Sequence, residues 1–472
     1  MLDKVLVKAR KACLLLKDEL LKSFEYVSIL GEANKGIINH VSFRNKMISD
    51  SDISYGYVAK VFNGKGYSEY AFSYIDESNY LDIAKKVIEC SKLDNLKQER
   101  VNVLSLKGEK LERDYERLNP NPLSLDEITN RLNNICDKLK EKGEPIVQGI
   151  ARFNQIEVSK IFIDNTKNLS QYYTWTNSYV IAVASNGENT KIARKGSGSV
   201  DSKESLDKLA LMVDDVCDMA IKLLDAKPIV PGVYDVITDP SITGLIAHEA
   251  FGHGVEMDMF VKNRAKSIGY LNKRVASDLV NMHDGANAAL NIASYFFDDD
   301  GILAKDTLII KNGILQTGIS DSLSALELKT IPTGNGRRES YSHKTYTRMT
   351  NTYFEKGKDK LEDMIKSIKH GYYLVETNNG MEDPKNWQIQ CTAEYGLEIK
   401  DGKFTGNIVS PVVISGYVPD VLESISMVSD EFKLDGGGYC GKGHKEWVRV
   451  CDGGPHLKAR VKLGWLKELK IF

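Results

Sequence analysis

The segment that most constrains the fold of this chain is Lys227-Pro228-Ile229-Val230-Pro231-Gly232. Proline cannot continue a helix and glycine weakens regular structure, so the helical pattern of residues 206–224 has to end here. Before this segment, helical and strand patterns alternate, whereas most of the chain after it has patterns typical of strands. We therefore predict an α+β protein, with an α/β N-terminal domain at residues 1–227 and a predominantly antiparallel β C-terminal domain at residues 228–472.

Local patterns predict the individual elements. Apolar residues recur at helical spacing in residues 2–22 and 80–90, and a capping box of Ser124 with Glu127 favours a further helix. Alternating patterns predict strands at residues 27–30, 37–43, 57–62, 67–74, 156–163, 172–184, 409–415 and 448–451. Asn312-Gly313 and Asp401-Gly402 predict two tight hairpins.

Charge and cysteine content exclude several classes of protein. Lys and Arg number 63 against 65 Asp and Glu, a net charge of −2, so no global basic field attracts nucleic acid. No uncharged apolar run approaches the ~20 residues of a membrane span, and residues 1–22 lack the apolar core of a signal peptide. The odd count of seven cysteines does not suggest a disulfide framework. We expect a cytoplasmic protein with no membrane contact and no direct binding of nucleic acid.

The stretch most informative about function is His248-Glu249-Ala250-Phe251-Gly252-His253, an HExxxH pattern in a chain with eight histidines. Zinc proteases commonly place two histidines four residues apart, about 40° from one another around a helix at ~100° per residue. Here the spacing is five, which splays the two rings by about 140° on an ideal helix. Both can bind one metal only if the helix unwinds or gains a π-bulge, which Gly252 and Gly254 make easy. We therefore predict a distorted helix at residues 251–254.

A metal held by both histidines would allow Glu249 to act as general base toward a water molecule activated by the metal. A catalytic zinc site needs a third protein ligand and an open position. The candidates are Cys440, Cys451, Glu256, Asp258, His283 and His444. Small residues around Cys440 favour it because they let the backbone approach a metal closely, and its thiolate would suit zinc.

Four motifs occur in order in the second half of the chain. They are residues 248–258, Gly334-Asn335-Gly336-Arg337-Arg338 with Ser340-Tyr341, Arg348-Met349-Thr350-Asn351-Thr352, and Tyr439-Cys440-Gly441-Lys442. Together they resemble the TldD branch of the TldD/PmbA (TldE) metalloprotease family. The resemblance spans nearly the whole chain and is strongest at residues 228–455. The two-histidine motif is specific to the catalytic TldD type, because the PmbA/TldE type is similar in fold but lacks the motif.

The resemblance implies zinc held by His248, His253 and Cys440, with Glu249 as the catalytic carboxylate. The C-terminal domain would then carry a metal-binding helix. The resemblance also implies a dimer that encloses a proteolytic cavity, usually a heterodimer with a TldE/PmbA-type subunit, with a homodimer as the other possibility. The implied substrates are unfolded or leader-type peptides, bound in extended form by strand addition.

Other polar residues have two interpretations each. Glu256 and Asp258 are either acceptors that fix the tautomers of the metal-binding histidines or the solvated end of the helix. Arg337 and Arg338 either clamp a substrate carboxylate or carbonyl, which is the interpretation we favour, or are simply exposed. Asp298-Asp299-Asp300-Gly301 is typical of a turn, because it lacks the ligand spacing of a calcium loop.

Two other functions stay open at this point. A non-catalytic regulatory or scaffold subunit would hold the metal as a structural clip, with a fourth ligand such as His444 or Cys451. Family members described as modulators of DNA gyrase suggest that role. A cysteine hydrolase would use Cys440 as nucleophile and His444 as base. Lys442 would either lower the pKa of the neighbouring thiol or face solvent.

Overall fold

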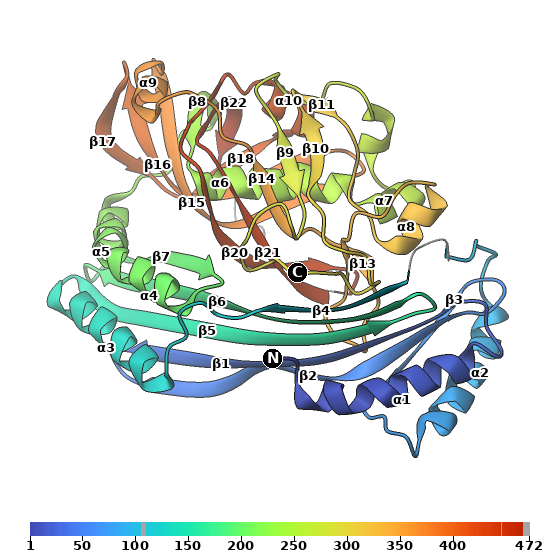
Figure 1. Cartoon of the computed structure of the whole chain (residues 1–472). Helices are drawn as coiled ribbons and strands as arrows, with labels where there is room; N and C mark the ends of the chain where they lie inside the picture. The colour runs from blue at the N-terminus through green and yellow to red at the C-terminus, as the bar shows by residue number, and fades with distance from the viewer. Residues whose placement is uncertain (105–109, 445, 466–472) are drawn as a thin grey trace.

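The computed structural model describes residues 1–104, 110–444 and 446–465 and shows a mixed α/β protein (Figure 1). Within these residues, one large sheet contains the strands up to Ser199, and three further sheets contain the strands from Gly232 onward. None of the described helices is long and apolar enough to cross a membrane.

The N-terminal sheet consists of long, mostly antiparallel strands. They are β1 (Val27–Ser42), β2 (Lys46–Phe62), β3 (Tyr67–Phe72), β4 (Leu111–Arg117), β5 (Ile146–Ile163), β6 (Lys167–Ser185) and β7 (Thr190–Ser199). The strand order is β3-β2-β1-β5-β6-β4, with β7 also paired to β6, and only β4 and β6 run parallel. Residues 27–30 and 37–42, expected within two separate strands, lie in the single strand β1, because β2 and β5 bond to its two edges, and Phe43 of the expected strand 37–43 lies just beyond its end.

Helices cover the N-terminal sheet. They are α1 (Lys4–Leu20), α2 (Tyr80–Asn95), α3 (Leu125–Glu141), α4 (Ser202–Leu211), α5 (Val213–Lys222) and the 3₁₀ turn η1 (Leu223–Asp225). In Figure 1, α1, α2 and α3 lie on the side of the sheet away from the C-terminal half. The predicted capping box is confirmed, because Glu127 N–H donates to Ser124 Oγ (3.3 Å) and Ser124 N–H donates to Glu127 Oε2 (2.8 Å). The single helix expected at residues 206–224 is instead α4 and α5, each packed against β6 and β7.

The C-terminal half contains the other sheets. One has the order β15-β8-β22-β18-β16-β17, with β19 on β22, and β15 also pairs with β16, so the sheet closes on itself. Its strands are β8 (Gly232–Thr238), β15 (His370–Asp383), β16 (Gln388–Lys400), β17 (Lys403–Val409), β18 (Val412–Tyr417), β19 (Met427–Val428) and β22 (Leu457–Gly464). The next, of order β11-β10-β9-β14-β21-β20, consists of β9 (Met282–Asp284), β10 (Thr307–Lys311), β11 (Ile314–Leu315), β14 (Asn351–Phe354), β20 (Lys433–Lys442) and β21 (Glu446–Gly454). A small ribbon pairs β12 (Gly336–Arg337) with β13 (Tyr346–Thr347).

Most strand pairs of the C-terminal half are antiparallel, and β8–β15 and β14–β21 are parallel. Both predicted hairpins are confirmed, since Asn312-Gly313 and Asp401-Gly402 have positive φ at both turn residues and join β10 to β11 and β16 to β17. The strand expected at residues 409–415 is wrong in its bounds. Pro411 has no N–H to donate to a neighbouring strand, so β17 ends before it and β18 begins after it.

Short helices lie between these sheets. They are α6 (Pro240–Leu245), the π-helix η2 (Ile246–Gly252), the 3₁₀ turns η3 (His253–Val255) and η4 (Lys266–Tyr270), α7 (Met257–Val261), α8 (Ser322–Glu327), α9 (Leu361–Lys366) and α10 (Val418–Glu423). The helix formed by α6 and η2 lies in the main hydrophobic core of the C-terminal half, where Ala247 and Phe251 are fully buried.

The two halves of the chain share buried surface. Val375 of β15 and Tyr395 of β16 belong to the same hydrophobic cluster as Leu132 of α3. The turn predicted at residues 298–301 is confirmed, with a φ of +71° at Gly301, and it faces the N-terminal sheet, where Asp300 forms a buried ion pair with Lys60 (2.8 Å). Because the halves pack this closely, their division at residues 227/228 stays a prediction.

Candidate metal centre

The helix that carries the HExxxH pattern is distorted, as the spacing predicts. α6 continues into the π-helix η2 and then the 3₁₀ turn η3. The N–H of His253 bonds to the carbonyl of His248, five residues earlier, and this wider turn brings the ring centroids to 5.1 Å. The φ of Gly252 is an ordinary helical −60°. Its role is therefore close packing rather than backbone freedom, because a Cβ there would lie 2.1 Å from Met349 Sδ.

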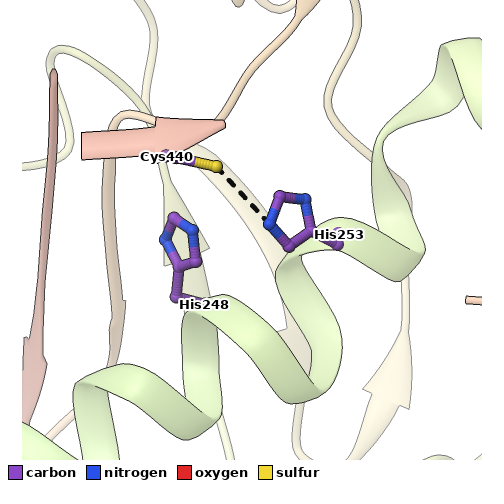
Figure 2. Close-up of side chains that lie close together, drawn as sticks. All are labelled: His248, His253 and Cys440. Carbon is purple, nitrogen blue, oxygen red and sulfur yellow. Dashed lines mark hydrogen bonds between the residues drawn. The ribbon is translucent and has the colours of Figure 1, made fainter. Parts of the chain in front are cut away.

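Three side chains converge at this turn, His248 and His253 from the helix and Cys440 from β20 (Figure 2). Their candidate ligand atoms all lie within 4.8 Å of one another, and Cys440 Sγ is 3.4 Å from His253 Nε2. His248 and Cys440 are 4% and 5% exposed, and the buried Nδ1 of His248 has no hydrogen-bond partner among the described residues. Two imidazoles and one thiol this close together fit the nitrogen and sulfur ligands that zinc prefers.

Glu256 orients the ring of His253. Its Oε2 lies 3.1 Å from His253 Nδ1. Burial raises the pKa of Glu256, but Lys442 and His253 outweigh burial and lower that pKa to about 2. The ionised carboxylate can only accept, so Nδ1–H donates to it and Nε2 is left facing Cys440. Glu256 is 1% exposed, so its interpretation as a solvated helix end is wrong.

Lys442 connects the cysteine strand to the histidine helix. Its Nζ donates to Glu256 Oε2 (2.9 Å), to Asp258 Oδ1 (2.8 Å) and to the carbonyl of Thr347 (3.0 Å). Burial lowers the pKa of Lys442, but the two carboxylates reverse this and raise it. The structure therefore places Asp258, which is also buried, on Lys442 rather than on a histidine ring, and Lys442 does not face solvent.

Glu249 lies beside the three converging side chains. Its Oε2 is 3.9 Å from His253 Nε2, and its side chain is 18% exposed. Burial raises the pKa of Glu249, against the opposing effect of the two histidines. A carboxyl group whose pKa is closer to neutral exchanges protons more readily at neutral pH. Gly380 of β15 makes room for this side chain, since a Cβ there would lie 2.6 Å from Glu249 Cγ.

The three converging groups influence one another's charge. Burial raises the pKa of the Cys440 thiol, but His253 and His248 more than reverse this and hold it well below its ordinary value. Burial lowers the pKa of His248, and Cys440 reverses that effect and raises it to about 9. The two histidines therefore favour the thiolate form of Cys440, which is the form that binds metals, and a metal cation would replace the imidazole protons as its counter-charge.

Sequence reasoning missed the residues that anchor the cysteine strand. Arg348, which is 1% exposed, donates to the carbonyl of Cys440 and, at 3.0 Å, to that of Glu446. In the same motif, Thr350 donates to Asp284, which is fully buried on β9. The available signal was an arginine within a run of uncharged residues, which predicts a buried charge with backbone partners.

The other ligand candidates lie elsewhere. His283 uses both ring nitrogens to contact carboxylates, at 2.7 and 2.9 Å, and His444 is exposed. Cys451 is buried on β21, with its sulfur toward the carbonyl of Leu434. Within the described residues, the cluster of possible metal ligands contains only the three side chains of Figure 2.

Arg337 and Arg338 have different surroundings. Arg338 is 6% exposed and donates from both amino groups to Glu69 of β3, at 2.9 and 2.7 Å. Arg337 donates to the carbonyl of Met349 at 2.6 Å and lies over the ring of Tyr295. The ion pair of Arg338 opposes its use as a substrate clamp, and a substrate role for Arg337 stays a prediction.

Comparison with known proteins identifies relatives of this chain. Residues 231–461 match the family model of the PmbA/TldA metallopeptidase C-terminal domain. A metalloprotease of Methanothermobacter thermautotrophicus is 30% identical over 318 residues, which cover 67% of this chain and 69% of that protein. A metalloprotease of Methanocaldococcus jannaschii is 27% identical over 93% of this chain and 96% of its own length. A zinc metalloprotease TldD homolog of Saccharolobus solfataricus is 30% identical over 62% of this chain and 68% of its own.

Solved structures resemble both halves of the chain. TldE from Thermococcus kodakarensis superposes with a TM-score of 0.71 at 19% identity, over 96% of this chain and 100% of its own. A putative modulator of DNA gyrase from Bacteroides thetaiotaomicron gives a TM-score of 0.77 at 16% identity, over 97% of this chain and 99% of its own. At these identities the likeness shows the fold alone.

Proposed function

The chain belongs to the PmbA/TldD family of metalloproteases, and we propose that it is a zinc-dependent peptidase of the TldD type. The observation that carries the proposal is the convergence of His248, His253 and Cys440 beside Glu249. A catalytic zinc site has three protein ligands and one open position, whereas a structural site has four protein ligands. The cluster of three, within the described residues, supports the catalytic kind.

In this proposal the chain's own residues bind the metal and move protons. His248, His253 and Cys440 hold zinc, which when bound supplies a Lewis acid that polarises a peptide carbonyl. Glu249 takes a proton from the attacking water and passes it to the leaving amine. Glu256 accepts the Nδ1–H of His253 and so keeps Nε2 directed at the metal.

We propose unfolded or leader-type peptides as substrates, bound in extended form by strand addition. The proposed partner is a TldE/PmbA-type subunit in a heterodimer, with a homodimer as the alternative, and the fold likeness to TldE from Thermococcus kodakarensis supports it. The proposed location is the cytoplasm, because the seven cysteines, all within the described residues, form no disulfide.

A regulatory or scaffold subunit with a structural metal is the second candidate, because two similar structures are described as putative modulators of DNA gyrase. That role calls for a fourth protein ligand, and neither His444 nor Cys451 belongs to the described cluster. A cysteine hydrolase with His444 as base is disfavoured, since Cys440 Sγ contacts the ring of His253 at 3.4 Å and His444 is exposed.

The test compares the wild type with Glu249→Gln and with Glu362→Gln, a matched change on the exposed surface of α9. Each protein is purified alone and after co-expression with a TldE-type subunit. Zinc is measured by elemental analysis, and peptide cleavage is measured with and without a chelator. We expect Glu249→Gln to keep its zinc and lose about 10²–10⁴-fold in cleavage rate, and Glu362→Gln to match the wild type. Cleavage by Glu249→Gln at the parental rate, or cleavage that survives zinc removal, overturns the proposal.

A further inference from the structure

A cavity of about 520 Å³ lies between the N-terminal sheet and the hairpin of β20 and β21. Its aromatic lining includes Trp175, Tyr295, Tyr439 and Trp447. Tyr439 precedes Cys440 on β20, and successive side chains of a strand point to opposite faces. The cavity therefore borders the face of the hairpin opposite to the Cys440 side chain, and none of the proposed zinc ligands lines it.

The guanidinium of Arg449 in this cavity has few partners. Arg449 is 8% exposed and lies between the rings of Trp175 and Tyr439, 4.6 and 4.7 Å from their centroids. Its hydrogen bond to the carbonyl of Gly438 is long, at 3.4 Å, and its Nε and Nη2 have no partner among the described residues. Burying a charged group without a counter-ion is costly, and an anion that enters the cavity would offset that cost.

Arg337 is a second cation of the cavity without a carboxylate partner among the described residues. The other two cations that line the cavity are already neutralised. Lys160 is bonded by Asp299, and Arg338 is bonded by Glu69. The cavity therefore has two guanidinium groups, Arg337 and Arg449, that are available to an incoming anion.

Two carboxylates also line the cavity, Asp52 and Glu339, and both are exposed. Asp52 accepts from the hydroxyl of Tyr439 at 3.3 Å, and Glu339 accepts from the backbone N–H of Trp447 at 3.1 Å. Water and salt screen these exposed charges, whereas they screen buried Arg449 much less. The interior of the cavity therefore favours an anion, although its rim carries both signs of charge.

We propose that this cavity is a carboxylate-binding subsite that holds the free C-terminus of a bound peptide, with Arg449 and Arg337 as its anchors. A guanidinium binds a carboxylate through two parallel hydrogen bonds, and the aromatic walls can pack against the last side chain of the peptide. This inference rests on the proposed function, which supplies peptides as ligands. It names peptides with a free C-terminus as the preferred class.

The experiment measures binding by titration calorimetry to the full-length Glu249→Gln protein. The probes are an N-acetylated hexapeptide ending in Phe, as the free acid and as the amide, and an amidated peptide with an internal Glu. We expect the free acid to bind at least about tenfold more tightly than either amide. Arg449→Met should remove this preference and leave binding of the Phe amide unchanged. Arg194→Met should keep the preference, because Arg194 is exposed and lies over Tyr179 outside the cavity.

Equal affinity for the acid and the amide overturns the inference. Tight binding of the amidated peptide with an internal Glu overturns the assignment to the C-terminus. If Arg449→Met is unfolded at the assay temperature, Arg337→Met and Arg449→Lys serve in its place, and both should reduce the preference. Binding needs neither zinc nor cleavage, so an inactive protein that prefers the free acid contradicts the proposed function alone. Cleavage without any such preference contradicts only the present inference.

Discussion

Two clusters of buried charge in this molecule use the same kinds of ion pair and differ in what they leave unpaired. The junction cluster joins the two halves of the chain and consists of Lys60, Lys160, Arg338, Glu69, Asp299 and Asp300. Each of its cations contacts a carboxylate. At the candidate metal centre, the charges of Lys442, Glu256 and Asp258 are also paired. The contacts that run from Lys442 through Glu256, however, end at His253, beside a thiol and a second imidazole.

The junction cluster fits a stabilising role, whereas the metal centre fits a binding role. A buried ion pair with all its partners present specifies how two parts of a chain fit together. The metal centre instead directs three donor atoms at one another, and the buried Nδ1 of His248 lacks a partner among the described residues. We infer that the junction cluster holds the fold together and that the metal centre is built to receive a cation.

The largest expected effect comes from Cys440→Ser. A serine hydroxyl is a poor zinc ligand but nearly matches the volume of a thiol, so zinc binding and peptide cleavage should be lost while the melting temperature stays close to that of the zinc-free wild type. Elemental analysis, a cleavage assay and thermal unfolding check this. A variant that unfolds globally, or that keeps its zinc, would break the distinction between the two clusters.

The next effect comes from Lys60→Met in the junction cluster. This change leaves Asp300 buried without its main partner, so the free energy of unfolding should fall by about 3–5 kcal/mol. Denaturant unfolding measures the loss, and Lys85→Met, which removes a surface pair with Asp82, should cost no more than about 1 kcal/mol. Zinc content should match the wild type. Loss of zinc with unchanged stability would reverse the roles that we assign.

The sequence predicts those features that depend on neighbouring residues. The capping box at Ser124, the hairpin at Asn312-Gly313 and the distorted helix between His248 and His253 each involve residues a few positions apart. The junction cluster was not predictable, because Arg338 and Glu69 are 269 positions apart and no local pattern pairs them. Cys440 lies between these cases, since its neighbours favoured it among six candidates and only the resemblance singled it out.

A moderate effect is expected from Lys442→Met at the metal centre. Without Lys442 the carboxylate of Glu256 loses its strongest partner, so His253 is held less firmly and zinc affinity should fall by about 10–100-fold. Competition with a chelating dye measures the affinity. Lys442→Arg, which keeps the charge, should recover part of it, and Lys262→Met should have no effect, because Lys262 is half-exposed and 3.9 Å from Asp258. Unchanged affinity in Lys442→Met would show that Lys442 belongs with the structural charges.

The smallest effect is a pH dependence at Glu69 in the junction cluster. Burial raises the pKa of Glu69, but Arg338 and Lys60 outweigh burial and lower it from an ordinary 4.5 to about 2. A carboxyl group whose pKa is lowered in the folded state stabilises the fold at any pH above its unfolded-state pKa. That contribution is lost as the pH falls through the folded-state pKa. Glu69→Gln should therefore flatten the decline of the melting temperature between pH 4.5 and 2.

This measurement is best made in proteins that also carry Cys440→Ser. In those proteins acid-driven release of zinc cannot contribute to the decline of the melting temperature with pH. Glu112→Gln, an exposed change on β4, serves as the control and should keep the parental slope. A slope in Glu69→Gln equal to that of the control would mean that the Arg338 pair adds no pH-linked stability. The junction cluster would then stabilise the fold through the pairs of Lys60 and Lys160 with the aspartates of the turn, and Arg338 would be released for the substrate role that its ion pair now opposes.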